Sequence, residues 1–323
     1  MKKIYLLTIG ICFMTTLLAQ SPGGVSSGLQ LWLKADASST LTLGGSSVGA
    51  WTYFNNSSNS FTTVAGTAPT LVTNAINGLP GVSFNGAKMD GPTGANAPIP
   101  AGSEAYSVFA VWKTASAASP QRPWTQWDST AGAVSGNGTS LWLYNPGTGL
   151  EWGDQPEISP YTQGVSNPVT TGTFYLSEMN LLNATSNDLE LTDQTNFATG
   201  PTVLSTGNGS NARANLSTVA HSLGSRENPT DEPFNGTLAE LIVYSNSVSA
   251  GAARNQIFSY LSMKYGIPIG AALVSSAGTT VWDGNATYSN DVFGLAVDNT
   301  SGLNVQSSNP STTAGVSGAG NMT

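Results

Sequence analysis

The stretch FNGTLAELIVYSNSVSAGAARNQIFSYLSMKYGI, residues 234–267, decides the fold. Within it, LAELIVY (238–244) is a short apolar run typical of a buried β-strand. A helix is predicted over about 250–265, because Ser249 is a good N-cap, Gly266 provides a stop signal, and apolar residues recur at helical spacing between them, namely Ala253, Ile257, Tyr260, Leu261 and Tyr265. We expect this helix to pack its apolar stripe against a β domain and to close it.

The chain before this stretch consists largely of short strand-like runs separated by Gly, Pro and Asn. In GLQLWLKAD (28–36), three leucines alternate with Gln30, Trp32 and Lys34, as expected for a strand with two different faces. Further runs lie at 81–86, 106–113, 140–145, 173–183 and 188–192. So many strands with no helix between them predict an all-β fold, a two-sheet sandwich over residues 28–269 with the helix as its C-terminal cap.

The two ends of the chain differ from the strand-rich region between them. Residues 1–19 are interpreted as a signal peptide, because Lys2 and Lys3 precede an apolar run that is too short to span a membrane. We therefore expect a protein that is secreted or held at the outer cell surface, without a transmembrane segment in the mature chain. Residues 20–27 are predicted to be a flexible N-terminal segment. Residues 270–323 predict the start of a second β unit, too short to be complete, so we expect a longer parent polypeptide.

Several segments resemble LamG-like and concanavalin A-like domains in large surface proteins of bacteria with type IX secretion. They are GLQLWLKAD, INGLPGVSFNG (76–86), YSVFAVWK and, most specifically, residues 234–267 with their KYGI ending. The segment 280–308 is similar to the one that usually follows in that family. The resemblance implies that the sandwich is an antiparallel jelly roll, and it also implies a cell-surface location and a multidomain parent. It leaves the function open, because this fold is used by lectins, glycosidases, adhesins and spacers alike.

Composition excludes several classes of function. The net charge is −8 at pH 7 and no basic stripe occurs, so nucleic acid is not an expected partner. The single cysteine, Cys12, lies in the predicted leader, which leaves the mature chain without disulfides or a cysteine nucleophile. With His221 as the only histidine, zinc sites built on His and Cys are excluded as well, and we interpret His221 as an ordinary strand or loop residue.

Aromatic side chains gather with acids between residues 124 and 161. A sugar ring has an apolar face and a rim of hydroxyls, so flat aromatics beside acceptor groups suit it. From this group we predict as ligand contacts Trp124, Trp127, Asp128, Glu151, Trp152, Asp154 and Glu157. Residues 151–157 are interpreted as an acidic loop, because Gly153 and Pro156 disfavour a regular strand. The alternative for Trp142 and Tyr144, which share one face of a run, is a place in the core.

A structural calcium ion is a further prediction. Calcium takes carboxylate, amide and backbone oxygens, and the chain is rich in all three. The candidate ligands are Asp154, Glu157, Asp231 and Glu232.

The sequence offers little support for catalysis. Retaining β-glucanases of this fold place carboxylates at two-residue steps on one strand, and no such run is present. Glu178 and Glu240 are isolated strand acids. Each is interpreted as a structural carboxylate hydrogen-bonded to loop backbone, with a ligand for a cation or glycan as the alternative, and the two could meet across a sheet. We therefore expect no enzyme but a non-catalytic adhesion or carbohydrate-binding module, with an extracellular glycan or surface protein as its partner. The alternatives are a structural spacer and a glycoside hydrolase.

Overall fold

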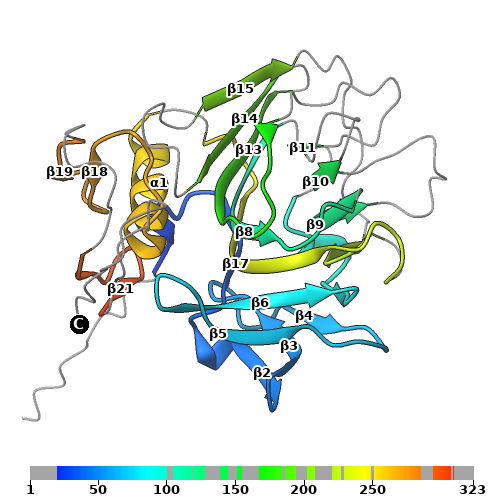
Figure 1. Cartoon of the computed structure of the whole chain (residues 1–323). Coiled ribbons are helices and arrows are strands. Elements are labelled where there is room, and N and C mark those ends of the chain that lie inside the picture. The colour runs from blue at the N-terminus through cyan, green and yellow to red at the C-terminus, as the bar shows by residue number, and fades with distance from the viewer. Residues whose placement is uncertain are drawn as a thin grey trace, which may run out of the picture.

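The structure of the chain, a computed structural model, is all-β and antiparallel, as predicted (Figure 1). It describes residues 20–99, 105–118, 120–127, 139–144, 151–154, 167–183, 186–193, 202–207, 220–226, 229–248, 251–284, 294–306 and 308. Within these ranges there is one α-helix, α1 (Ala252–Tyr265), and three short 3-10 helices, η1 (Pro22–Gly24), η2 (Ser38–Thr40) and η3 (Gly94–Asn96).

Most of the strands belong to one hydrogen-bonded network. Its members are β1 (Leu29–Lys34), β2 (Leu41–Gly44), β3 (Ser47–Thr52), β4 (Ser60–Thr63), β5 (Thr70–Ile76), β6 (Leu79–Asn85), β7 (Met89–Asp90), β8 (Tyr106–Thr114), β9 (Gln121–Trp127), β10 (Thr139–Tyr144), β11 (Glu151–Asp154), β12 (Asn167–Pro168), β13 (Tyr175–Asn183), β14 (Ser186–Asp193), β15 (Thr202–Gly207), β16 (Ala220–Leu223) and β17 (Asn235–Tyr244). Two small ribbons follow, formed by β18 (Leu273–Val274) with β19 (Thr280–Trp282) and by β20 (Ala296–Asp298) with β21 (Leu303–Val305).

The network consists of two runs of neighbouring strands. In the first run, β17 pairs with β8 on one side and with β6 and β1 on the other, and β13, β14 and β15 continue from β8. The second run has the order β2-β3-β4-β7-β16-β9-β10-β11-β12. A bridge between Ser47 of β3 and Thr70 of β5 connects the runs.

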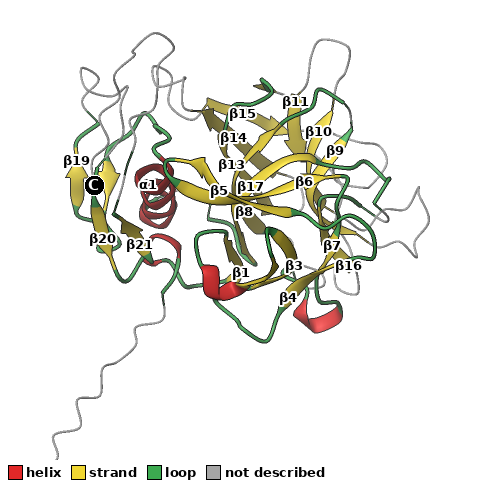
Figure 2. Cartoon of the chain, turned by 60° about the horizontal axis from the view of Figure 1, so that its bottom comes forward, coloured by secondary structure: helices red, strands yellow, loops and turns green. Residues whose placement is uncertain are grey.

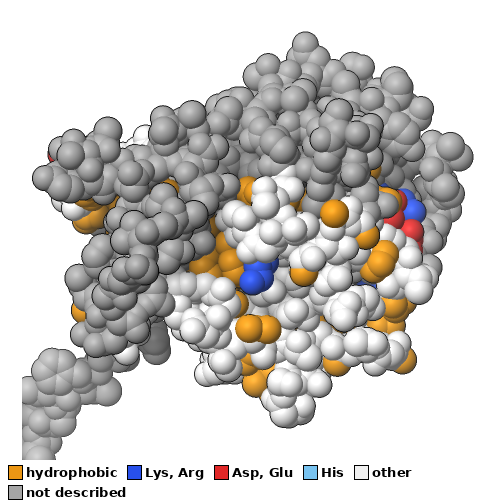
Figure 3. All heavy atoms as spheres, viewed as in Figure 1, with side chains coloured by type: hydrophobic (Ala, Val, Ile, Leu, Met, Phe, Trp, Pro, Cys, Tyr) orange, Lys and Arg blue, Asp and Glu red, His pale blue; other side chains and the backbone are white. Residues whose placement is uncertain are grey.

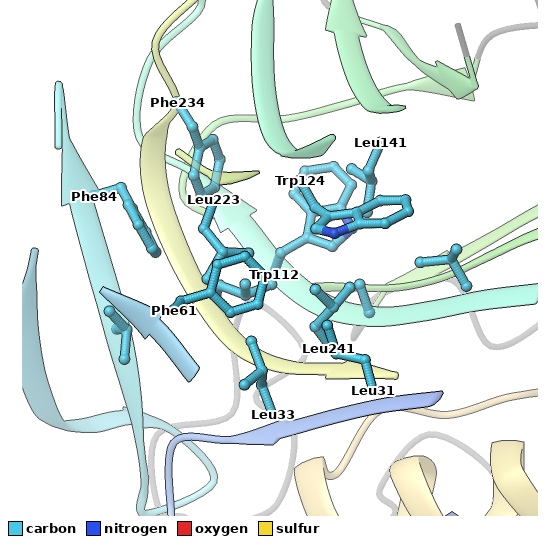
Figure 4. Close-up of a cluster of buried hydrophobic side chains, with 14 of the residues drawn as sticks. Leu31, Leu33, Phe61, Phe84, Trp112, Trp124, Leu141, Leu223, Phe234 and Leu241 are labelled. Carbon is cyan, nitrogen blue, oxygen red and sulfur yellow. The ribbon is translucent and has the colours of Figure 1, made fainter. Parts of the chain in front are cut away.

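The main core contains side chains from both runs (Figure 4). The first run contributes, among others, Leu33, Trp112 and Leu241, and the second run contributes Phe61, Trp124 and Leu141. Each of these side chains is at most 1% exposed. Since burial of one large apolar side chain contributes about 1.5–3 kcal/mol, this shared core holds the two runs together.

A second cluster lies on the other face of the first run, under α1. Trp32, Phe109 and Ile242 from the sheet pack there with Ile257 and Leu261 from the helix. The alternation predicted for β1 is therefore correct, but both of its faces are buried. Figure 2 shows α1 between the main network and the terminal ribbons, and Leu303 and Val305 of β21 belong to the same cluster.

The ends of α1 differ in how well the sequence predicts them. Gly266 caps the helix in the left-handed conformation, with φ 64°, as expected. The N-cap is Gly251 and not Ser249, which lies outside the described residues.

In place of the flexible segment expected at 20–27, η1 packs against the helix. A Cβ on Gly23 of η1 would lie 2.4 Å from the backbone of Gln256, so the close approach requires glycine there.

Two further expectations concern the chain ends and the acidic segment. The predicted signal peptide, residues 1–19, lies outside the described residues. The expected acidic loop is a strand over its first four residues, β11, whose backbone pairs with β10 and β12. Gly153 is tolerated there because the strand is short and ends before Pro156. In the part of the chain that the structure describes, no helix has the length and apolar character needed to cross a membrane.

Candidate functional site

The face of the second run that looks away from the main core carries a row of small side chains across seven strands. Backbone pairing aligns them in the order Thr42, Ala50, Thr62, Asp90, Ser222, Thr125 and Ser140. Their chain neighbours, such as Phe61, Met89 and Trp124, point into the core. Since adjacent strand residues face opposite sides, these seven residues, hereafter the polar row, lie on the outer face. With strands about 4.8 Å apart, the polar row is about 29 Å long.

The half of the polar row on β16, β9 and β10 is buried and hydrogen-bonded. Thr125 Oγ1 and Ser140 Oγ are 2.8 Å apart, and Arg122 donates from Nη1 to Ser140 Oγ at 2.5 Å. Ser222 Oγ donates to the carbonyl of Ser225 at 2.5 Å. Trp142, two residues after Ser140 on the same strand, shares this face and is 7% exposed. This half thus combines hydroxyls, a guanidinium and an aromatic ring.

The half on β2, β3, β4 and β7 is open to solvent. Thr42 and Thr62 are exposed, and the Asp90 side chain is 46% exposed. Asp90 forms an ion pair with Lys88, whose side chain is only 5% exposed. The pair therefore presents its carboxylate to the surface and not its ammonium group.

Two more ion pairs lie beside the buried half. Arg122 pairs with Glu232, and the Nε of Arg226 lies 2.8 Å from the Oδ2 of Asp231. Glu232 has a positive φ of 54°, which a non-glycine residue rarely adopts, in the turn that leads into β17. On the face in Figure 3, few charged side chains are visible, and blue and red adjoin at its right margin, near that turn.

The structure places three of the four predicted calcium ligands, namely Asp154, Asp231 and Glu232. Both Asp231 and Glu232 serve as partners of arginine. Among the residues that the structure describes, no group of three or more His, Cys, Asp or Glu side chains could hold a metal ion. Asp154 lies in β11, and Glu157 lies outside the described residues.

The predicted ligand contacts are only partly brought together. Trp124 is fully buried in the main core, which corrects the expectation of a surface contact, because β9 turns its indole inward beside Leu141 (Figure 4). Trp127 ends β9, and its backbone pairs with Ala220. Asp128 lies outside the described residues. The remaining predicted contacts, Glu151, Trp152 and Asp154, lie on β11, the strand next to the end of the polar row.

Glu240 is the centre of a buried network under α1. It accepts hydrogen bonds from Trp32 Nε1 at 2.5 Å, Tyr260 Oη at 2.9 Å, Lys264 Nζ at 2.7 Å and Tyr265 Oη at 2.7 Å. Burial, reinforced by the Glu240 carboxylate, raises the pKa of both tyrosines well above the ordinary value, so their hydroxyls remain donors. The structural interpretation of this carboxylate is therefore correct, although its partners are side chains and not loop backbone.

Glu178 lies on the same outer face of the first run and is also engaged by the helix. Arg254 Nε donates to Glu178 Oε2 at 2.8 Å. Lys264 additionally reaches Asp36 Oδ1 at 2.7 Å. The two strand acids therefore lie under α1, each with its own cation, and do not meet in an open site.

The only histidine is buried at the edge of the main core. His221 lies on β16, and its Nε2 is 2.6 Å from the hydroxyl oxygen of Tyr53. Burial lowers the pKa of His221 to about 3, so the ring is neutral at any ordinary pH. As expected, His221 is an ordinary strand residue.

Comparison with protein families gives one match, to a domain of unknown function, DUF8202, over residues 253–321. The match covers α1 and the ribbons but not the polar row. No curated protein matches the chain.

Comparison with solved structures finds proteins that act on or bind carbohydrates. A mutant of a GH54 α-L-arabinofuranosidase soaked with 4-nitrophenyl α-L-arabinofuranoside is 15% identical, with a TM-score of 0.52 over 77% of this chain and 61% of that one. The same type of enzyme soaked with a cyclic sulfate inhibitor has a TM-score of 0.51 at 15% identity, over 77% of this chain and 61% of that one. Domain 4 of AbnA, a GH43 extracellular arabinanase from Geobacillus stearothermophilus, in complex with arabinotriose, has a TM-score of 0.47 at 14% identity and covers 72% of this chain and 98% of its own.

The likenesses to the two arabinofuranosidase structures show a shared β-rich fold, and they correct the expectation that the chain is not an enzyme. Glycoside hydrolases are among the proteins with this fold. The absence of a β-glucanase carboxylate run was therefore no ground for setting catalysis aside. The chain aligns with 61% of the length of the arabinofuranosidase.

Proposed function

We propose that this chain is a carbohydrate-recognising domain of an exported or cell-surface protein, and that the polar row is its glycan-contact surface. In this proposal the two runs of strands form a concanavalin-like jelly-roll sandwich, with LamG-like domains as relatives. The observation that carries it is the contrast between the two outer faces. The face under α1 is filled with apolar side chains, whereas the other carries a row of hydroxyls and one carboxylate.

The chemistry of the polar row suits a sugar. Threonine and serine hydroxyls both donate and accept hydrogen bonds, as sugar hydroxyls do. These groups are accessible on the open half, where Thr42 and Thr62 are exposed. The open half, from Thr42 to Asp90, spans three strand spacings or about 14 Å, which favours an oligosaccharide over a single sugar.

A glycan array probed with the chain tests the proposal. Thr62→Val removes an exposed hydroxyl from the polar row, and Thr73→Val makes the same change at an exposed position of β5 in the first run. We expect specific binding that Thr62→Val weakens and Thr73→Val leaves unchanged. A blank array with the folded protein, or equal effects of the two variants, would contradict the assignment and favour a spacer role.

Hydrolysis of the bound glycan is a second candidate, supported by the fold shared with arabinofuranosidases. It needs two carboxylates about 5–10 Å apart across the scissile bond. Asp90 lies on β7, and Glu151 and Asp154 lie on β11, four strand spacings or about 19 Å away. Asp90 is therefore too far from these two acids to form such a pair with them. The measurement is release of 4-nitrophenol from 4-nitrophenyl α-L-arabinofuranoside and of reducing ends from arabinan. No release of product from any of these substrates by the folded protein would contradict this candidate.

A further inference from the structure

The ion pairs around the polar row restrict the chemistry of its ligand, on the premise that the row binds a glycan as proposed above. Three basic side chains of the described second run lie on or beside the polar row, namely Lys88, Arg122 and Arg226. Each has a carboxylate partner from this chain: Asp90, Glu232 and Asp231. These three positive charges, which could hold an acidic sugar, are therefore already neutralised.

The two partners of the Lys88–Asp90 pair differ in their exposure to solvent. The lysine side chain is 5% exposed and the aspartate side chain is 46% exposed. A ligand that approaches the open half of the polar row meets the carboxylate first. An anionic sugar would be disfavoured there, because it would approach the exposed carboxylate, while the lysine that pairs with this carboxylate is buried.

The buried half of the polar row also disfavours an anionic sugar. Arg122 is fully buried, and it donates both to Glu232 and to Ser140. To bind a uronic acid or sialic acid, the guanidinium would have to exchange the Glu232 carboxylate for that of the ligand. Removal of the partner of a buried guanidinium is strongly unfavourable, and binding of one sugar carboxylate would have to offset this loss.

We infer that the polar row takes a neutral glycan, with Asp90 accepting hydrogen bonds from its hydroxyls. A carboxylate is a strong acceptor for two vicinal hydroxyls, because its two oxygens offer separate lone pairs. The threonine hydroxyls at positions 42 and 62 supply further donors and acceptors along the same line. Recognition of this kind depends on hydrogen-bond geometry and needs no fixed positive charge.

Three sets of oligosaccharides test the inference with the full chain. The neutral set is derived from arabinan, xylan and β-glucan, the anionic set from polygalacturonate and sialylated glycans, and the cationic set from chitosan. We expect binding to the neutral set, with a dissociation constant that changes less than about twofold between low and high ionic strength, since no ion pair with the ligand forms. Preference for the anionic or the cationic set would overturn the inference while leaving glycan recognition intact. No binding to any set would instead overturn the proposed function.

The variant Asp90→Asn sharpens the test, because it removes the exposed charge and leaves Lys88 without its carboxylate. We expect affinity for the neutral ligand to fall about tenfold and affinity for the anionic set to rise. Thr73→Val, on the other run, should change neither affinity. If Asp90 serves only to neutralise Lys88, Asp90→Asn will leave neutral binding unchanged and the inference fails. Should Asp90→Asn not fold, Thr62→Val on the same row tests the same surface without altering charge, and unchanged neutral binding then sinks the inference.

Discussion

Under α1, the outer face of the first run buries Glu240 and Lys264 at 0% and 2% side-chain exposure, whereas the outer face of the second run leaves Asp90 46% exposed. Both are carboxylate–lysine pairs on strand faces that look away from the main core. The first is enclosed by a helix and satisfied by four donors. The second keeps part of its carboxylate available to solvent.

This difference in burial gives the two ion pairs different roles. A buried pair fixes one arrangement of the chain, because removal of either partner leaves an uncompensated charge in a place without water. An exposed pair contributes little to stability but retains an acceptor for a ligand. The face under α1 is thus specialised for holding the protein together, and the polar row is available for recognition.

The largest expected effect is on the buried pair. Lys264→Met leaves the Glu240 carboxylate buried without its cation, and it should lower the unfolding free energy by about 3–5 kcal/mol. Denaturant titration followed by tryptophan fluorescence measures this. The double variant Lys264→Met with Glu240→Gln should recover part of the loss. A single variant within about 1 kcal/mol of the parent would contradict the assigned role of the network.

A smaller loss is expected at the other end of the helix. Arg254→Met removes the cation from Glu178, but the arginine side chain is 15% exposed and water can partly replace it. We expect about 1–3 kcal/mol of destabilisation by the same titration. Lys113→Met, which removes a cation from over the Phe174 ring 4.8 Å away, provides a matched control with a smaller effect.

Acid should weaken the helix-covered face first. Burial opposes ionisation of Asp36, but the charges of Lys264 and Lys34 prevail and hold its pKa below the ordinary value of 3.8. An acid with a lowered pKa in the folded state contributes stability above its unfolded pKa and loses it as the pH falls through the folded pKa. Melting temperatures should therefore drop below about pH 4. The curve of Asp36→Asn should be flatter, and parallel curves would contradict this origin.

The smallest effect on stability is expected at the polar row. Asp90→Asn should change the unfolding free energy by less than about 1 kcal/mol, because the pair is partly exposed and solvent screens it. Measured beside Lys264→Met in the same titration, it tests the comparison directly. A loss as large as that of the buried pair would mean that both faces serve stability alone.

The sequence predicts elements whose signal is local. The alternation in β1, the apolar runs of β8 and β17, and the glycine that ends α1 are all found. Prediction fails where a local signal competes with pairing. Gly153 favoured a loop, yet the backbone of β11 pairs with β10. Trp124, flanked by polar residues and a proline, looked exposed, yet its position in the strand turns it inward.

The polar row could not be predicted from the sequence, for a physical reason. Its members come from seven strands, and long-range pairing alone places Thr62 beside Asp90 and Asp90 beside Ser222. Each contributes one small polar residue next to an apolar one, a pattern that any half-buried strand shows. The pairing of Glu178 and Glu240 with separate helix cations was equally hidden, because the register between α1 and the sheet depends on packing.

The way α1 is held has a consequence for how such domains are divided. The family match begins at residue 253, at the second residue of the helix. A cut there would part Arg254 and Lys264 from the carboxylates on β13 and β17, leaving unmatched charge and bare apolar surface on both fragments. A fragment of this chain that is to keep α1 should therefore begin at the first strand of the sheet, because the boundary of sequence similarity at residue 253 divides the ion pairs that hold the helix.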